Sequence, residues 1–267
     1  MTTTHADTAS RTAGTLGPAV LVDAEPNAVW IALSRPPLNI FDLAALRELA
    51  PALESAGRSH ARVVVLRSDV PRAFSAGVDV ADHTADSIDE LLDVTRVYSA
   101  ALLQLDSIVI AGLHGWALGG LAELALLADV VIAADDTTIG IPEIHLGMLA
   151  PVGSALLPRL CGGRWAARLM LGENVDAPTA QRIGLVTEVV PRNDLVQRVR
   201  ARADSLAGLS GSALRAAKRA MTLRERERLL DEIAYALETY RRAVARSADA
   251  AEGIAAFLEK RQPRWST

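Results

Sequence analysis

The chain has 267 residues, enough for one large domain or two small ones with a sizeable buried core. A formal net charge of −4 gives no reason to expect nucleic acid or an acidic membrane as a partner, and no apolar run approaches the roughly 20 residues that cross a bilayer. The single cysteine, Cys161, excludes an intrachain disulfide and a multi-cysteine metal site and is typical of a reducing cytosol, so we expect a cytoplasmic protein.

The first part of the chain alternates strand and helix patterns. Residues 1–16 are rich in Thr and Ala and lack an apolar block, so we expect a disordered tail rather than a signal peptide. In chain order, the pattern then predicts a hairpin at 20–22 and 29–33, a helix at 41–56, a strand at 62–67, a helix at 88–105, a strand at 107–112, a helix beginning at Gly119-Gly120 and a strand at 128–134. This alternation indicates an α/β fold.

After Pro191 the pattern becomes helical. The predicted helices occupy 193–207, 212–221, 224–247 and 248–259. A helical region that follows an α/β core is a second layer or an oligomerisation element. The sequence therefore divides into a tail at 1–16, a core at 17–200 and a C-terminal helical region at 201–267.

Two glycine-containing segments carry the first functional signal. Residues 74–79 (FSAGVD) and 117–123 (ALGGLAE) each place a glycine where an apolar strand ends. A backbone without side chains at a strand end can aim free N–H groups at a ligand oxygen, and two such segments can supply two donors to one oxygen. The alternative is that Gly77 and Gly120 only make tight turns.

Two carboxylates accompany these segments. Glu123 lies one helical turn beyond Gly120, in a stretch where nearly every other residue is apolar, so it must be paired or must face a cavity. Glu143, after Pro142, is a second candidate, although a surface acid at a helix start is the simpler local interpretation. Two N–H donors and two carboxylates suit chemistry next to a carbonyl that becomes an enolate.

Five segments resemble one known family in order and register, over roughly residues 17–264. They are 33–39 (LSRPPLN), 73–79 (AFSAGVD), 115–120 (GWALGG), 140–147 (GIPEIHLG) and 255–261 (AAFLEKR). On these segments the chain resembles the crotonase superfamily, the enoyl-CoA hydratase/isomerase group. The resemblance implies an α/β spiral of ββα turns over 17–200, and terminal helices that pack in homotrimers or dimers of trimers.

The resemblance also implies an activity. It assigns the oxyanion hole to the N–H groups of Val78 and Gly120, and the two family glutamates to Glu123 and Glu143. By that analogy, Glu123 positions and activates water while Glu143 protonates the α-carbon, or the two share these roles across one water. The implied protein is an enoyl-CoA hydratase that adds water across the 2,3 double bond and gives 3-hydroxyacyl-CoA. It needs no cofactor and no metal, because coenzyme A is part of the acyl-CoA substrate.

Further positions are similar to the family's CoA-contacting and substrate-contacting residues. They are Leu38, Ala76, Gly77, Asp79, Pro142, Phe257 and Lys260. The resemblance implies that the Ala76 carbonyl contacts the adenine, and a lysine near phosphate has an electrostatic rationale. For Phe257 and Lys260, ordinary residues of an amphipathic helix are an equally good interpretation.

One segment departs from the family pattern. After Gly147 the run 148–154 (MLAPVGS) keeps one glycine and displaces the proline by one residue, in a loop that should shape the acyl pocket and support Glu143. Double-bond isomerisation or another enolate reaction therefore stays open beside hydration. A non-catalytic CoA-binding protein, or a nucleic-acid-binding one through the basic stretch at 215–228, is the remote alternative, disfavoured by the net charge and the mixed signs. Fatty-acid metabolism is the default setting by analogy, and we expect no nucleic-acid or membrane partner.

Overall fold

The computed structural model describes residues 17–266, so the tail predicted at 1–16 lies outside the described residues. A six-stranded sheet forms the centre of the fold, with the spatial order β1-β2-β4-β7-β9-β12. Its strands are β1 (Val20–Glu25), β2 (Ala28–Leu33), β4 (Val63–Ser68), β7 (Ile108–Leu113), β9 (Val130–Ala134) and β12 (Glu188–Val190). The predicted hairpin is the antiparallel pair β1–β2, and all other pairs are parallel. Helices cover the sheet and bury the apolar side chains of its parallel strands.

A second sheet of four very short strands lies beside the first, in the order β11-β10-β8-β5. Its strands are β5 (Ala73–Ser75), β8 (Trp116–Leu118), β10 (Thr138–Gly140) and β11 (Val175–Asp176), and β3 (Ile40–Phe41) pairs separately with β6 (Gly77–Val78). β8 pairs in parallel with both β5 and β10. Segments that leave the carboxyl ends of these strands therefore emerge at one edge, which brings together three motifs that are far apart in the sequence.

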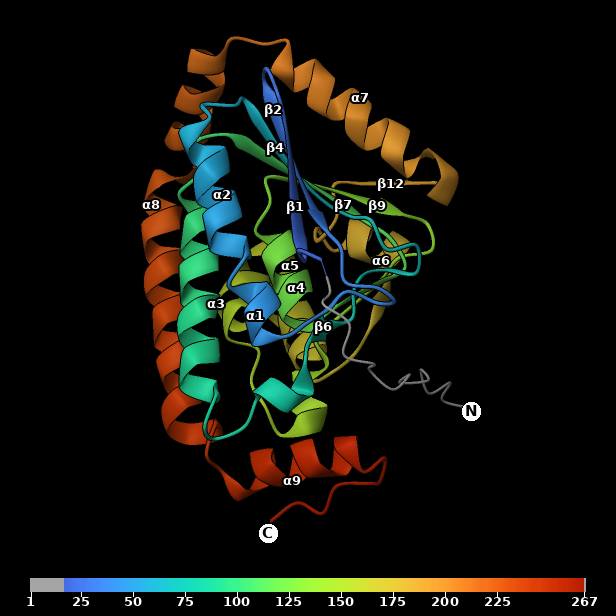
Figure 1. Cartoon of the computed structure of the whole chain (residues 1–267), viewed down its shortest axis with the longest axis vertical. Coiled ribbons are helices and arrows are strands. Elements are labelled where there is room, and N and C mark those ends of the chain that lie inside the picture. Colours follow the sequence, from blue (N-terminus) through green and yellow to red (C-terminus); the bar gives the residue numbers. More distant parts are fainter. Residues whose placement is uncertain (1–16, 267) are drawn as a thin grey trace.

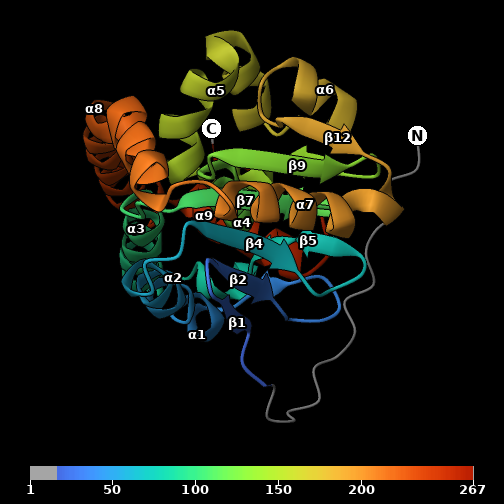
Figure 2. The same cartoon turned by 90° about the horizontal axis from the view of Figure 1, so that it is seen from above.

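Helices enclose the two sheets. They are α1 (Leu43–Leu46), α2 (Leu49–Arg58), α3 (Ile88–Leu103), α4 (Gly119–Leu126), α5 (Pro151–Met170), α6 (Ala177–Arg182), α7 (Leu195–Ala207), α8 (Gly211–Thr239) and α9 (Ala248–Leu258), with 3₁₀ turns η1 (Val80–Asp82), η2 (Pro142–Leu146) and η3 (Arg192–Asp194). In Figure 1, α3 and α8 run side by side, and α9 lies at the opposite end of the molecule from α7. Figure 2 shows α7 across one face of the main sheet.

The structure changes several predicted helices. The helix predicted at 41–56 is divided, because its first residue, Phe41, belongs to β3 and the chain bends between α1 and α2. The two helices predicted at 212–221 and 224–247 are one, α8, which continues into a π-helical turn at Tyr240–Val244 (η4), since no glycine or proline interrupts the chain there. Helix α5 went unpredicted because Pro158 and Gly162 obscure its pattern, and Gly162 has a φ of 74° at a kink.

Asn39 joins the two sheets. Its side chain is fully buried, and its amide nitrogen donates to Leu33 O at 3.2 Å, to Ser68 Oγ at 2.8 Å and to Phe74 O at 2.9 Å. Its Oδ1 accepts from Arg35 N at 2.5 Å. One side chain therefore ties the ends of β2 and β4 to β5. Its φ of 52° lies in a region that asparagine tolerates better than most residues.

The same network reaches the glycine loop. Ser75 Oγ donates to Asn39 O at 2.6 Å and accepts from Gly77 N at 2.9 Å. The loop at 74–79 is thus held in place by buried side chains as well as by strand pairing.

We expect Asn39→Ala to lower the free energy of unfolding by about 3 kcal/mol, because several buried backbone groups lose their partners. Urea denaturation at a fixed protein concentration measures this change. Asn193→Ala is the control, since Asn193 is exposed, and it should change the free energy by less than about 0.5 kcal/mol. Equal effects of the two substitutions would show that the Asn39 hydrogen bonds do not stabilise the fold.

Candidate active site

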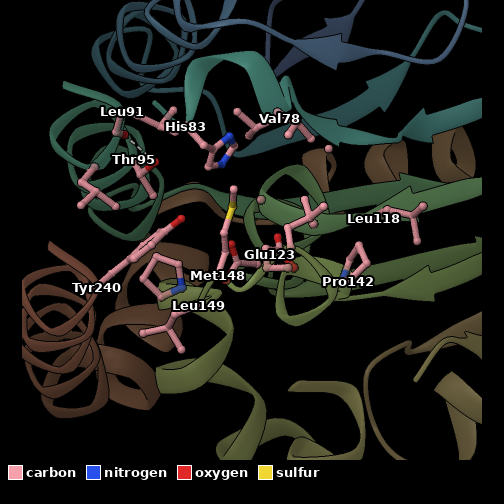
Figure 3. A pocket seen from close by; sticks show the side chains of 18 of the residues that line it. Val78, His83, Leu91, Thr95, Leu118, Glu123, Pro142, Met148, Leu149 and Tyr240 are labelled. Atoms are coloured by element: carbon pink, nitrogen blue, oxygen red, sulfur yellow. Dashed lines mark hydrogen bonds between the residues drawn. The ribbon is translucent and has the colours of Figure 1, made fainter. Parts of the chain in front are cut away.

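The three loops at the edge of the second sheet surround a cavity of about 310 Å³ (Figure 3). They are the β6 loop, the first turn of α4 and η2, and α3, the end of α8 and α9 complete the wall. The residues that line the cavity are Ala76, Gly77, Val78, Val80, His83, Leu91, Leu92, Thr95, Tyr98, Leu118, Gly119, Gly120, Glu123, Pro142, Glu143, His145, Leu146, Met148, Leu149, Pro151, Tyr240 and Phe257. Most of the predicted site residues are therefore brought together, although they come from distant parts of the sequence.

Glycines allow the loops to approach each other closely. Gly77 has a φ of 103°, and a Cβ there would lie 3.3 Å from the carbonyl oxygen of Leu118. Gly119 has a φ of 59°, and a Cβ there would lie 2.9 Å from Oε1 of Glu143. Positive φ and close contact both favour glycine at these positions.

The two predicted oxyanion-hole residues are neighbours in space. A Cβ on Gly120 would lie 3.1 Å from Cγ2 of Val78. Gly120 is the second residue of α4, so its N–H belongs to the first turn, which has no intrahelical carbonyl to bind. Leu118 at the N-cap contributes no side-chain hydrogen bond to this turn. The helix N-terminus next to Val78 is therefore suited to bind a developing negative charge.

Glu123 is buried in the cavity wall and is also hydrogen-bonded. Its side chain is 2% exposed, and it accepts hydrogen bonds from the N–H groups of Gly153 and Val152 in the first turn of α5. Its other oxygen, Oε2, would lie 3.8 Å from a Cβ on Gly120. Burial raises the pKa of Glu123, and the nearby carboxyl group of Glu143 raises it further.

Glu143 lies in η2 and has a different environment. Its Oε2 is buried and has no hydrogen-bond partner among residues 17–266. Burial raises the pKa of this carboxyl group as well. An added Cβ would lie 2.9 Å from Oε1 of Glu143 at Gly119 and 3.8 Å from Oε2 of Glu123 at Gly120, so the two carboxyl groups face adjacent glycines at the start of α4. Such a pair keeps a proton at a higher pH than an isolated glutamate would.

The divergent segment at 148–154 forms the link from η2 into α5. Met148 N donates to the backbone oxygen of Glu143 at 3.1 Å, which supports η2. The direct side-chain contact, however, is from Gly153 to Glu123. The sequence predicts that this segment supports Glu143, and the hydrogen bond from Met148 does so. The segment also supplies the N–H groups of Val152 and Gly153 that stabilise the carboxylate of Glu123.

Not every predicted CoA-contacting residue reaches the cavity. Leu38, Asp79 and Lys260 are absent from its lining. Leu38 lies next to the loop, since its carbonyl accepts from Ala76 N at 2.9 Å, whereas the Asp79 side chain accepts from Ala81 N at 3.1 Å at the start of η1. Lys260 is exposed just after α9.

Phe257 reaches the cavity because α9 packs closely against η2. A Cβ on Gly253 of α9 would lie 2.1 Å from the carbonyl oxygen of Leu146, so only glycine permits this approach. Phe257 itself is 53% exposed, which places it at the rim of the cavity.

Sequence reasoning missed the polar residues of the inner wall. Two of the three tyrosines in the chain, Tyr98 on α3 and Tyr240 after α8, are buried there together with Thr95. Burial and the two carboxyl groups raise the pKa of both tyrosines. His83 lines another part of the wall, and its Nδ1 lies 3.0 Å from the carbonyl oxygen of Asp79. A helical pattern alone cannot distinguish these residues from ordinary core residues.

Part of the basic stretch at 215–228 packs into the interior of the protein. Lys218 is 5% exposed, and its Nζ donates to Ser107 O and Asp129 Oδ2, both at 2.7 Å. Arg219 pairs with Asp106. Within residues 17–266, no three His, Cys, Asp or Glu side chains are grouped to hold a metal ion, and none of the helices there is long and apolar enough to span a bilayer.

Comparisons with known proteins agree with this geometry. The sequence model of the family described as Enoyl-CoA hydratase/isomerase matches residues 23–267. A probable enoyl-CoA hydratase of Mycobacterium bovis is 36% identical, over 92% of this chain and 97% of the relative. The 2,3-dehydroadipyl-CoA hydratase of Escherichia coli is 33% identical, over 91% and 97% respectively. The crystal structure of an enoyl-CoA hydratase/isomerase from Pseudoalteromonas atlantica superposes with a TM-score of 0.82 at 26% identity, covering 93% of this chain and all of that one.

The family match spans nearly the whole chain, and the solved structure shares its arrangement of sheets and helices. The resemblance and the fold class inferred from the sequence are confirmed. The chain belongs to the enoyl-CoA hydratase/isomerase family and has the crotonase fold.

Proposed function

We propose that this protein is an enoyl-CoA hydratase, which adds water across the 2,3 double bond of an enoyl-CoA thioester and releases 3-hydroxyacyl-CoA. The observation that carries the proposal is the pair of buried carboxyl groups beside adjacent glycines at the start of α4. One carboxyl group is fixed by two N–H donors and the other has an oxygen without a partner.

In the proposed reaction the thioester oxygen accepts hydrogen bonds from the N–H groups of Val78 and Gly120. These donors stabilise the negative charge that the oxygen gains as an enolate forms, which lowers the barrier. Glu123 removes a proton from water as the water oxygen bonds to C3, and Glu143 gives its proton to C2. The substrate has then gained the elements of one water molecule. Transfer of the proton from Glu123 to Glu143, directly or through solvent, restores the starting state.

The hydrogen bonds of the two glutamates support different roles for them in this proposal. The N–H groups of Gly153 and Val152 stabilise an ionised Glu123. Burial raises the pKa of both groups, to about 8 for Glu123, where Glu143 adds to the rise, and to about 7 for Glu143. Because the buried Oε2 of Glu143 has no donor among the described residues, we place the proton of the pair on Glu143 in the reacting state. This arrangement gives a base and an acid on the same side of one cavity.

The rest of the proposal follows the family. The CoA portion contacts Leu38, Ala76, Gly77, Asp79, Pro142, Phe257 and Lys260, the chain assembles as a homotrimer or dimer of trimers in the cytoplasm, and neither metal nor cofactor takes part. The nucleic-acid alternative loses its main support, because Lys218 and Arg219 are already paired within the fold.

We expect Glu123→Gln and Glu143→Gln each to lower kcat for hydration of crotonyl-CoA by about 1,000-fold, because each removes one proton-transfer group. Loss of the ultraviolet absorbance of the conjugated thioester measures the rate. Glu227→Gln is the control, since Glu227 is exposed on α8, and it should retain activity. If the wild-type protein isomerises a 3-enoyl-CoA but hydrates no enoyl-CoA, the proposed hydratase activity is wrong and the reaction is isomerisation.

We expect Gly119→Ala to lower kcat by about 100-fold through displacement of the Glu143 carboxyl group. The new Cβ would lie 2.9 Å from Oε1 of Glu143, at a φ of 59°. Gly163→Ala is the matched control, because no heavy atom lies within 4 Å of its added Cβ. Equal activity of the two variants would contradict the placement of Glu143 against Gly119.

The free energy of unfolding should report the raised pKa of Glu143. An unfolded glutamate ionises near a pKa of about 4.3, whereas the buried folded group keeps its proton to higher pH. The folded state therefore binds more protons in this window, and this group's contribution to stability falls as the pH rises. We expect Glu143→Gln to increase stability relative to wild type more at about pH 8 than at about pH 5. Urea denaturation at both pH values measures the difference, and an equal effect at both would contradict the raised pKa.

A further inference from the structure

The side chain of Tyr240 is largely buried, and its hydroxyl group faces the cavity. Tyr240 is 4% exposed, and its hydroxyl has no hydrogen-bond partner among residues 17–266. Figure 3 shows this hydroxyl pointing into the cavity from the side of the wall that also carries Thr95. Because this hydroxyl lies at the cavity surface and donates to no group of the described residues, it is available to a polar group of a molecule that occupies the cavity.

The backbone at Tyr240 is also unusual. Helix α8 ends at Thr239, and Tyr240 begins the π-helical turn, in which Ala245 N donates to Tyr240 O at 2.9 Å. π-Turns are rare and occur frequently at functional sites. The turn sets where the side chain of Tyr240 enters the cavity.

The neighbouring tyrosine differs because its hydroxyl is already partnered. Tyr98 Oη donates to Thr95 Oγ1 at 3.4 Å. A Cβ on Gly120 would lie 3.8 Å from Tyr98 Oη, so this wall begins close to the oxyanion site. With a volume of about 310 Å³ the cavity is at the small end of ligand pockets, so it takes a short acyl group, and Tyr240 supplies the donor without a protein partner on its wall.

The charges around the cavity restrict which substrate groups can bind beside Tyr240. The lining includes Glu123 and Glu143 but no arginine or lysine among the described residues. A carboxylate at the end of the acyl chain would be repelled and would find no cation. His83 adds no positive charge, because burial lowers its pKa and its Nδ1 donates to the Asp79 carbonyl, which leaves Nε2 as an acceptor. An uncharged hydroxyl group of the substrate can accept a hydrogen bond from Tyr240 without this repulsion.

Building on the proposed hydratase function, we propose that Tyr240 is a specificity-determining residue. Its hydroxyl donates a hydrogen bond to an uncharged oxygen that a short acyl group carries beyond the reacting double bond. The preferred substrate class is thus short enoyl-CoA thioesters with a hydroxyl substituent, and acyl groups that end in a carboxylate are excluded.

The test compares two thioesters of nearly equal shape, trans-5-hydroxyhex-2-enoyl-CoA and trans-hex-2-enoyl-CoA, in wild type, Tyr240→Phe and Tyr235→Phe. Tyr235 lies on α8 but is 76% exposed, so its substitution is the matched control. We expect wild type to favour the hydroxylated substrate in kcat/KM by about tenfold, with the difference mainly in KM. Tyr240→Phe should abolish this preference and Tyr235→Phe should keep it. The 2,3-dehydroadipyl thioester should be the poorest substrate.

A second measurement separates this proposal from the hydratase proposal. Calorimetric titration with the saturated thioesters 5-hydroxyhexanoyl-CoA and hexanoyl-CoA gives the same comparison without turnover. A binding preference that disappears in Tyr240→Phe would support the role of Tyr240 even if no enoyl-CoA is hydrated. Equal affinity of wild type for both thioesters, or an equal loss for both in Tyr240→Phe, would overturn the proposal, because Tyr240 would then act on packing or on the reacting centre.

Discussion

Two carboxyl groups share one buried cavity, and their different hydrogen-bonding environments limit the repulsion between them. In a low-dielectric space two ionised carboxylates this close would strongly disfavour each other. The chain treats the two groups unequally, since α5 directs the N–H groups of Gly153 and Val152 at Glu123 and leaves Oε2 of Glu143 without a donor. In the proposed reaction, this asymmetry makes Glu123 the base and Glu143 the acid.

The short strands hold that pair in place. β5, β8 and β10 contain only three residues each, yet their parallel pairing sets the glycine loop, the start of α4 and η2 at one edge. Strands this short gain little from their own hydrogen bonds. Asn39 compensates, because its buried side chain connects the main sheet to β5, and Ser75 extends the connection to Gly77. These hydrogen bonds thereby fix the loops of the site to the core.

Five of the six strands of the main sheet could be predicted from the sequence because they contain short apolar runs, such as Val63–Leu66, whereas the three-residue edge strand β12 was not predicted. The glycine segments and Glu123 stood out for a similar local reason, since a glycine pair at a strand end and a carboxylate in an apolar helix each break the surrounding pattern. The sequence indicated only the ends of two strands of the second sheet, at the glycine segments, because strands of two or three residues are too short to show an alternating pattern. The extent of α8 was misjudged because nothing local distinguishes a continuous helix from two abutting ones.

Contacts between residues that are far apart in the sequence were the other feature that could not be predicted. That Glu123 accepts from Gly153, thirty residues away, follows from how α5 packs on α4, which no spacing in the sequence encodes. The same holds for the inner wall, where Tyr98 and Tyr240 meet only because α3 packs against the end of α8.

Substrate choice within this family therefore has to be sought where the sequence is least informative. The relatives of this chain include hydratases whose names specify different acyl groups, including one for the dicarboxylic dehydroadipyl group, at about the same identity as an unspecified enoyl-CoA hydratase. Identity over the whole chain thus does not determine the acyl group. In the proposed function, the carboxyl pair and the glycine loops act at the reacting carbons, which all these substrates share. Discrimination must then come from the wall beyond those carbons, and in this chain the one tyrosine hydroxyl there without a partner, among the residues described, is that of Tyr240.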